Sequence, residues 1–190
     1  GSMLFLKEIV QGEKVGELKI LERFVSKLAA GSDLKDLNMT ATAENGWELG
    51  ITRFIKASPE KVWDIMTNRI GEWWCPKPWR AEFDKLERRA GGASTCTMYG
   101  PDGEVHPQPG TVLAWDEGRR FAFTDAVVGA LMPAGPFMIG IWSIEAEGDG
   151  TRYTALCRHW TEDDCKRHGE MGFDEGWGAC ADQLVQLCES

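Results

Sequence analysis

Between residues 79 and 159 the chain is a succession of short β-type segments, and this run limits the possible folds more than any other feature. The segments are rich in β-branched and aromatic residues. Short strands joined by tight turns pair with their neighbours in antiparallel fashion. The run therefore predicts an antiparallel sheet of about six strands. Its glycine-containing turns stand at Gly91-Gly92, Gly100–Gly103, Glu117-Gly118 and Gly148–Gly150.

Two short helices are expected before this run. A strand over 47–58 leads into Ser58-Pro59-Glu60, which offers an N-cap serine, a proline at the first helical position and an acid near the positive helix end. This helix ends near Asn68. A second short helix then carries Ile70 toward the paired tryptophans, and the prolines that follow end it.

One long helix is expected after the run, where Thr161 has an acid three residues on. Helices segregated from an antiparallel sheet predict an α+β domain with this helix across the sheet. Four glycines fall in its first half, and each costs roughly 0.8–1 kcal/mol relative to alanine. Close approach to the sheet is one explanation, and room for a ligand or a break in the helix is the other. The four are Gly169, Gly172, Gly176 and Gly178.

The first 38 residues differ in character from the rest. Apolar residues recur there at three- and four-residue spacing, which predicts an amphipathic helix over 17–30 that ends at Gly31. We expect residues 1–38 to be either an extension that docks on the domain or pairs two copies, or an element added in cloning. Residues 39–190 are expected to form the domain. A homodimer thus stays an open alternative.

The charge pattern excludes some classes of protein. The net charge is -9 and no basic cluster is present, which argues against a nucleic-acid partner. The longest uncharged run, 126–144, is interrupted by proline and glycine, so no membrane span is expected. The opening residues lack the apolar core of a signal peptide, so we expect a cytoplasmic protein.

The six cysteines include no C-x-x-C pair, which predicts reduced thiols in this compartment. Cys165 and His168 stand three residues apart, but a structural zinc site needs a second close pair. We therefore expect neither a metal site nor a cofactor.

The segment "GEWWCPKPW" at 71–79 holds three of the nine tryptophans. Indoles can form core, where they bury a large apolar area, or they can line a pocket. Two adjacent tryptophans on one short helix cannot face the same direction. Trp73, Trp74 and Trp79 are thus predicted to contribute a lid over a cavity, facing Trp177.

Strand alternation predicts the wall of that cavity. Residues two apart share a face of a strand, which groups Phe121, Phe123 and Asp125. The same rule groups Met138, Gly140, Trp142 and Ile144, and also Tyr153, Ala155, Cys157 and His159. If these faces point inward, they enclose an aromatic chamber. The predicted ligand-binding residues are Trp73, Trp74, Trp79, Phe121, Phe123, Trp142, Tyr153, Met171, Phe173 and Trp177.

Asp125 and His159 are the polar members of these faces and are the candidates for acid–base catalysis, with Tyr153 as a further option. The alternative, which strand ends favour, is that both are solvated. Nucleophilic catalysis has little support, since no G-x-S-x-G motif occurs and nothing near Cys157 predicts a lowered thiol pKa.

Five segments in this order resemble one known superfamily: "IKASPEKVWDIMTN", "EWWCPKPW", "AGGASTCTMYGPDG", "PGTVLAWDEGRRFAFT" and "GDGTRYTAL" before the capped helix. They resemble the START-like (SRPBCC, helix-grip) superfamily, and most of all its bacterial homologues of the heat-shock chaperone ATPase activator. The resemblance covers about 48–188. It implies a six- to seven-stranded curved sheet wrapped around the C-terminal helix, with a cavity for an apolar ligand. It supplies no catalytic signature.

Three functions follow as expectations. The residues favour a binding protein that takes a small apolar molecule, aromatic or lipid-like, between the sheet and the C-terminal helix. The second is a small enzyme of cyclase or hydrolase type acting on such a ligand. The third, from the resemblance alone, is a domain that interacts with a heat-shock chaperone. The sequence does not name the ligand.

Overall fold

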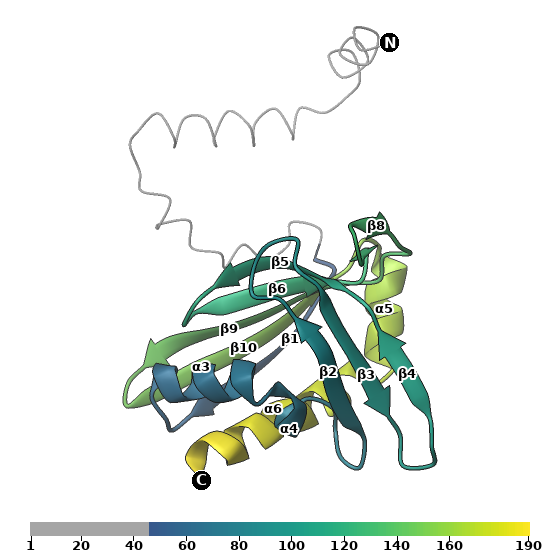
Figure 1. The fold of residues 1–190 in the computed structure, drawn as a ribbon. Helices are drawn as coiled ribbons and strands as arrows, with labels where there is room; N and C mark the ends of the chain where they lie inside the picture. Colours follow the sequence, from purple (N-terminus) through teal and green to yellow (C-terminus); the bar gives the residue numbers. More distant parts are fainter. Residues whose placement is uncertain (1–45) are drawn as a thin grey trace, which may run out of the picture. The chain divides into compact units, whose positions relative to one another are not determined.

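The computed structural model describes residues 46–190, which form an α+β domain of antiparallel sheets and four helices within that range (Figure 1). The helix expected over 17–30 lies outside the described residues. The domain boundary at residue 38 therefore stays a prediction.

The larger sheet has five antiparallel strands in the order β1-β10-β9-β6-β5. The expected hairpin between β9 and β10 is present, with Glu147 opposite Gly150 across a two-residue turn. Alternate residues of β10 are buried, including Tyr153, Ala155 and Cys157. The strands are β1 (Glu48–Ile55), β5 (Thr111–Asp116), β6 (Arg120–Thr124), β9 (Ile139–Glu147) and β10 (Gly150–Arg158).

The remaining strands form two smaller sheets, so the prediction of one sheet of six to seven strands is wrong in this respect. β2 (Arg80–Leu86), β3 (Ser94–Tyr99) and β4 (Val105–Gln108) make a three-stranded sheet, and a single bridge from Ala93 to Thr111 joins this part of the chain to β5. β7 (Val127–Val128) and β8 (Met132–Pro133) form a short ribbon.

The two expected helices follow β1. α3 (Pro59–Asn68) begins at the predicted cap, where Ser58 Oγ accepts a hydrogen bond of 3.3 Å from the Lys61 amide. α4 (Ile70–Trp73) is a single turn. Because both helices carry apolar residues toward the sheet, Val62, Met66 and Trp73 are fully buried.

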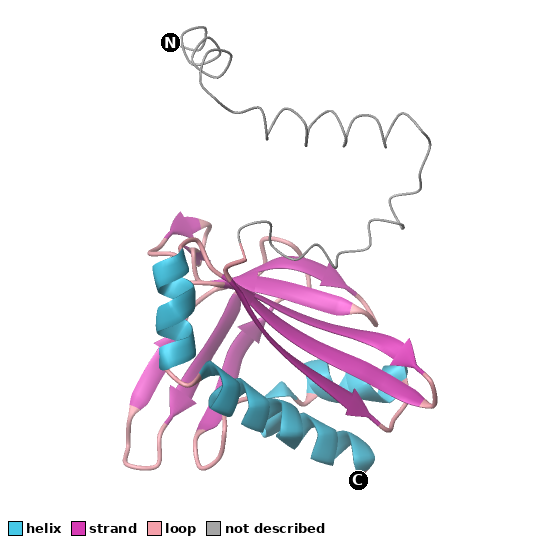
Figure 2. Ribbon diagram, turned by 180° about the vertical axis from the view of Figure 1, so that it is seen from behind, coloured by secondary structure: helices cyan, strands magenta, loops and turns pink. Residues whose placement is uncertain are grey.

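The C-terminal helical region is broken at Gly172, which is the alternative that its glycines offered, and the long helix that packs on the sheet begins at Phe173 and not at Thr161. α5 (Glu162–Glu170) and α6 (Phe173–Glu189) are separate helices whose axes run in different directions (Figure 2). The chain turns at Gly172, whose φ of 87° is in the left-handed region that glycine adopts without strain. The cap at Thr161 is as predicted, with its Oγ1 accepting from the Asp164 amide at 3.1 Å.

Close approach to the sheet does not explain the other helix glycines. A methyl group at Gly169 or Gly176 would meet nothing within 4 Å, and one at Gly178 would meet only the Arg53 guanidinium at 3.5 Å. The glycine-rich stretch therefore accounts for a break at Gly172 and for open space beside two other positions.

α6 contacts β1, α3 and α4, and one side chain of α6 fixes the proline-rich segment. The Gln183 side-chain amide donates to the carbonyl oxygens of Trp73 and Cys75, at 2.7 and 2.8 Å, and its oxygen accepts from the Lys77 amide at 3.1 Å. A segment that cannot form helix or sheet thus has its main-chain groups paired by a side chain.

Each helix that the structure describes is too short or too polar to span a bilayer.

Candidate functional site

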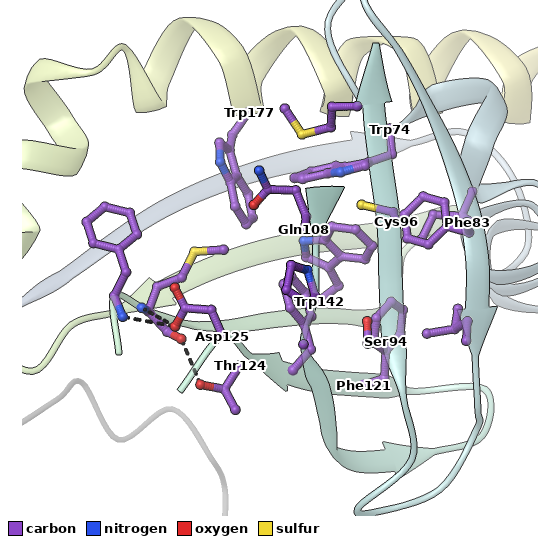
Figure 3. Close-up of a pocket in the computed structure, with 18 of the residues that line it drawn as sticks. Trp74, Phe83, Ser94, Cys96, Gln108, Phe121, Thr124, Asp125, Trp142 and Trp177 are labelled. Carbon is purple, nitrogen blue, oxygen red and sulfur yellow. Dashed lines mark hydrogen bonds between the residues drawn. The ribbon is translucent and has the colours of Figure 1, made fainter. Parts of the chain in front are cut away.

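A cavity of about 300 Å³ opens between the two larger sheets, and α4, α5, α6 and connecting segments contribute the rest of its wall (Figure 3). Its size is at the lower end of small-molecule sites, which run from about 300 to 1,000 Å³. Most of the lining is aromatic or sulfur-containing. The apolar lining is Ile70, Trp74, Phe83, Leu86, Cys96, Met98, Pro109, Gly110, Phe121, Phe123, Phe137, Met138, Trp142, Met171 and Trp177, and the polar lining is Ser94, Gln108, Thr124, Asp125 and His168.

Three indoles from three distant parts of the chain meet in this wall: Trp74 just after α4, Trp142 on β9 and Trp177 on α6. The ring centroids of Trp74 and Trp142 are 4.7 Å apart, and Trp74 and Trp177 are 4.9 Å apart in an edge-to-face arrangement. Phe121 and Phe123 continue the wall, with centroids 5.0 and 5.3 Å from that of Trp142. Such contacts hold rings in fixed orientations, so the wall is a preformed aromatic surface.

Six of the ten predicted ligand-binding residues line the cavity: Trp74, Phe121, Phe123, Trp142, Met171 and Trp177. The other four lie elsewhere: Trp73, Trp79, Tyr153 and Phe173. Trp73, Tyr153 and Phe173 are at most 2% exposed and belong to the core.

The adjacent tryptophans separate as expected for one helical turn. Trp73 points into the core, where its indole N–H donates to the Met66 carbonyl at 3.3 Å. Trp74 is half-buried and turns toward the cavity. Trp79 stacks on His106 of β4, with centroids 5.6 Å apart. Its position beyond the prolines places it against β4, a strand that the sequence analysis did not predict.

Asp125 lines the cavity at the end of β6, as its strand position predicted. Its Oδ1 accepts hydrogen bonds from the main-chain amides of Phe137 and Met138, at 2.9 and 3.1 Å (Figure 3). These bonds hold the carboxylate in place and leave Oδ2 without a hydrogen bond to any residue in 46–190.

His159 also follows a strand end, but it is buried at 5% exposure and does not line the cavity. Its Nε2 lies 2.9 Å from Nδ1 of His168, which does line the cavity. Burial, followed by the neighbouring His159 ring, lowers the pKa of His168 to about 4, against a smaller opposing effect of Asp125. His168 is therefore neutral near pH 7.

The thiols and the core phenol are poorly suited to act as nucleophiles or bases. Burial raises the pKa of Cys96, the thiol on the cavity wall, to about 12. Burial likewise raises the pKa of Cys157 and of Tyr153 well above their ordinary values. A protonated thiol is a weak nucleophile.

Metal ligands do not gather anywhere between residues 46 and 190, where no group of three or more His, Cys, Asp or Glu side chains is arranged to hold an ion. Among the described residues, the Trp142 indole N–H is buried without a hydrogen-bond partner, and the Trp142 ring forms part of the cavity wall.

The sequence analysis missed much of one wall. Phe83, Leu86, Cys96 and Met98 belong to the three-stranded sheet. Strand alternation could have grouped Cys96 with Met98, but Phe83 and Leu86 share the wall only because the register of β2 shifts between Phe83 and Lys85. The role of His168 carried no local signal. Its place on the wall follows from the break at Gly172, which sets the direction of α5.

Comparison with known proteins gives one family. The sequence profile of the family described as "Activator of Hsp90 ATPase homolog 1-like protein" matches residues 56–189. No curated protein matches the chain.

Several solved structures are similar to this chain. Protein NE0264 from Nitrosomonas europaea is 34% identical, with a TM-score of 0.69 over 74% of this chain and 92% of that one. Protein Ms6760 from Mycobacterium smegmatis is 25% identical, with a TM-score of 0.63 over 74% and 90%. The AHSA1 protein from Silicibacter pomeroyi, at 18% identity and a TM-score of 0.56 over 73% and 95%, shows the shared fold.

Proposed function

From the premise that this chain belongs to the family of Activator of Hsp90 ATPase homolog 1-like proteins, we propose that it binds a small apolar molecule, aromatic or lipid-like. The ligand occupies the cavity between the sheets and the C-terminal helices. The observation that carries the proposal is the aromatic wall of that cavity, built from Trp74, Trp142 and Trp177 with Phe121 and Phe123.

The exposure of these rings supports binding over simple core packing. Trp74, Phe123 and Trp177 are only half-buried although they face the interior of the domain. Covering apolar surface contributes about 25 cal/mol per Å², so a ligand that filled the space would gain free energy from contacts that the protein does not make with itself. Few polar groups interrupt the wall, which fits an apolar ligand.

Binding is favoured over catalysis by the state of the titratable groups. The cavity thiol is held protonated, and the Asp125 carboxylate is held by two main-chain amides. His159, one of the two residues predicted for acid–base chemistry, is separated from the cavity by His168. In an enzymatic version of this site, His168 would therefore take the place assigned to His159.

The test is native mass spectrometry of the purified chain, with denaturing extraction and tryptophan emission alongside. We expect a co-purifying small molecule whose removal shifts the emission. Trp177→Ala should lower retention of that molecule, whereas Trp79→Ala, which changes an indole off the wall, should not. A chain that carries no ligand, and whose emission is indifferent to a panel of aromatic and fatty compounds, would refute binding and move interaction with a heat-shock chaperone ahead.

A further inference from the structure

Two histidines form a hydrogen-bonded chain that ends at the cavity. The main-chain amide and Nδ1 of His159 both approach the Trp47 carbonyl oxygen, at 3.0 and 3.3 Å. A carbonyl oxygen only accepts, so Nδ1 of His159 carries the hydrogen. In the neutral ring, Nε2 of His159 is then an acceptor, and it takes the Nδ1 hydrogen of His168 across 2.9 Å. His168 is left with an unprotonated Nε2.

Three aromatic rings surround the imidazole of His168 and hold it in place. The centroid of the His168 ring lies 4.9 Å from Phe137, 5.1 Å from Phe173 and 6.2 Å from Trp177. His168 is 8% exposed and lines the cavity, and its Nε2 has no hydrogen-bond partner among residues 46–190. Among the described residues only the Trp142 indole N–H is both fully buried and without a partner, so Nε2 of His168 keeps some accessible surface. A ligand in the cavity that donates a hydrogen bond can therefore reach this nitrogen.

The charges around the cavity determine which ligands suit it. Asp125 is the only carboxylate among the lining residues of the described chain, and no lysine or arginine lines it. Oδ2 of Asp125 is a second acceptor without a described partner. A ligand carboxylate would meet a like charge and no cation, which disfavours it.

We propose that the part of the cavity wall where Phe137 contacts both His168 and Asp125 binds the hydroxyl group of an otherwise apolar ligand, with Nε2 of His168 as its acceptor. This rests on the proposed function, and it narrows the ligand class to alcohols and phenols. Fatty acids and aromatic carboxylates are disfavoured, because their charge would meet the Asp125 carboxylate and no lysine or arginine on the wall. His159 is a positioning residue, because it sets which nitrogen of His168 carries the hydrogen.

Three matched probes test the class of ligand: naphthalene, 2-naphthol and 2-naphthoate, each measured by equilibrium dialysis against the full chain at pH 7. In a cavity without a polar partner, the hydroxyl would weaken binding, because its desolvation is uncompensated. With the acceptor in place, we expect 2-naphthol to bind on the order of 3- to 10-fold more tightly than naphthalene. 2-Naphthoate should bind more weakly than either.

Variants assign the preference to the histidine. His168→Phe keeps a ring of similar size and removes the acceptor, so the preference for naphthol should disappear while naphthalene still binds. His168→Gln offers an amide oxygen and should keep most of the preference. Met171→Leu is the matched control on the same wall, and it should change the three affinities by a common factor. Thermal unfolding of each variant shows that it is folded.

A spectroscopic measurement tests the role of His159. Nitrogen NMR of the histidine rings should show Nδ1–H in His168 of the wild type, and the Nε2 signal should shift when 2-naphthol is added. His159→Phe should let the hydrogen of His168 move to Nε2 and reduce the naphthol preference. A structural role alone would not move these signals.

Two results would overturn the inference in distinguishable ways. Equal binding of naphthalene and 2-naphthol, or a preference that survives in His168→Phe, would refute the hydroxyl site and leave the proposed function standing. No binding of any of the three probes would refute the hydroxyl site together with the proposed cavity function.

Discussion

Gly140→Ala should place a methyl group where the ring of Phe123 now lies. Gly140 on β9 is paired with Phe123 on β6. A Cβ at Gly140 would stand 2.4 Å from Cζ of Phe123, and 2.7 and 2.9 Å from its two Cε atoms. The ring of Phe123 thus lies over Gly140 and fills the space that a side chain at this strand position would occupy.

The cost follows from this overlap. Carbon atoms prefer about 3.5–4.0 Å, so the ring must move by about 1 Å. Phe121 and Trp142 lie beside it, with centroids 6.2 and 5.3 Å away, which directs the ring toward the cavity. Overpacking costs about 1–3 kcal/mol, and the lower chain entropy of alanine in the unfolded state offsets about 0.4–1 kcal/mol. We expect a net loss of about 1–2 kcal/mol.

Thermal unfolding followed by circular dichroism measures this loss. For a chain of this length about 1 kcal/mol corresponds to a change of about 2–4 °C, so Tm should fall by about 2–8 °C. Gly135→Ala is the control, because a methyl group there would meet nothing within 4 Å. Its stability should be unchanged or slightly higher. Binding of a cavity ligand should weaken in Gly140→Ala alone.

A double variant separates overlap from other effects. Phe123→Leu removes the ring that the new methyl group displaces, so in the Gly140→Ala background it should cost less stability than it does in the wild type. If Gly140→Ala is as stable as the wild type and binds ligand equally well, Phe123 does not depend on Gly140 and the argument is refuted.

Three further predictions test other parts of the structure. Gly176→Ala should stabilise the domain by about 0.8–1 kcal/mol, because the position is in a helix and its methyl group meets nothing within 4 Å; a destabilised variant in thermal unfolding would contradict the open space. His168 favours its neutral form when folded, so the stability it contributes is full above its usual pKa of 6.5 and falls, by on the order of 2 kcal/mol, as the pH drops toward about 4. Urea unfolding from pH 7 to pH 4 should show this slope in the wild type and a smaller one in His168→Gln; equal slopes would refute it. Gln183→Leu should cost about 1–3 kcal/mol in urea unfolding, since the carbonyls of Trp73 and Cys75 lose their donor, and an unchanged midpoint would show that water replaces it.

Local sequence signals predicted the helix starts and the hairpin turn, because these depend only on residues that are neighbours in the sequence. Ser58 with Pro59, and Thr161 with Asp164, mark helix starts through side-chain caps that depend only on neighbours. The hairpin at Gly148–Gly150 is equally local. By contrast, β4 has only four residues, contains Pro107 and is exposed along its whole length, so its sequence shows no alternation of apolar and polar residues.

The tryptophan-rich segment shows both sides of this division. Helical geometry alone predicted that Trp73 and Trp74 would face different ways, and the structure has one in the core and one on the cavity wall. Which of them takes the wall was not predictable. The orientation of Trp73 and Trp74 depends on Gln183, whose side chain bonds the main chain of this segment at Trp73 and Lys77. Gln183 lies 106 residues after Lys77 in the sequence.

The sequence by itself determined the α+β class, the antiparallel strands, the helix caps and most of the aromatic residues of the wall, because caps, turns and two-residue alternation are properties of adjacent residues. Tertiary structure alone decided the division of the sheet and the meeting of His159 with His168 at the cavity, whereas the glycines had already offered the break at Gly172 as one alternative. These depend on distances between segments that are far apart along the chain. Such distances are set by packing of the whole domain, and no local pattern records them.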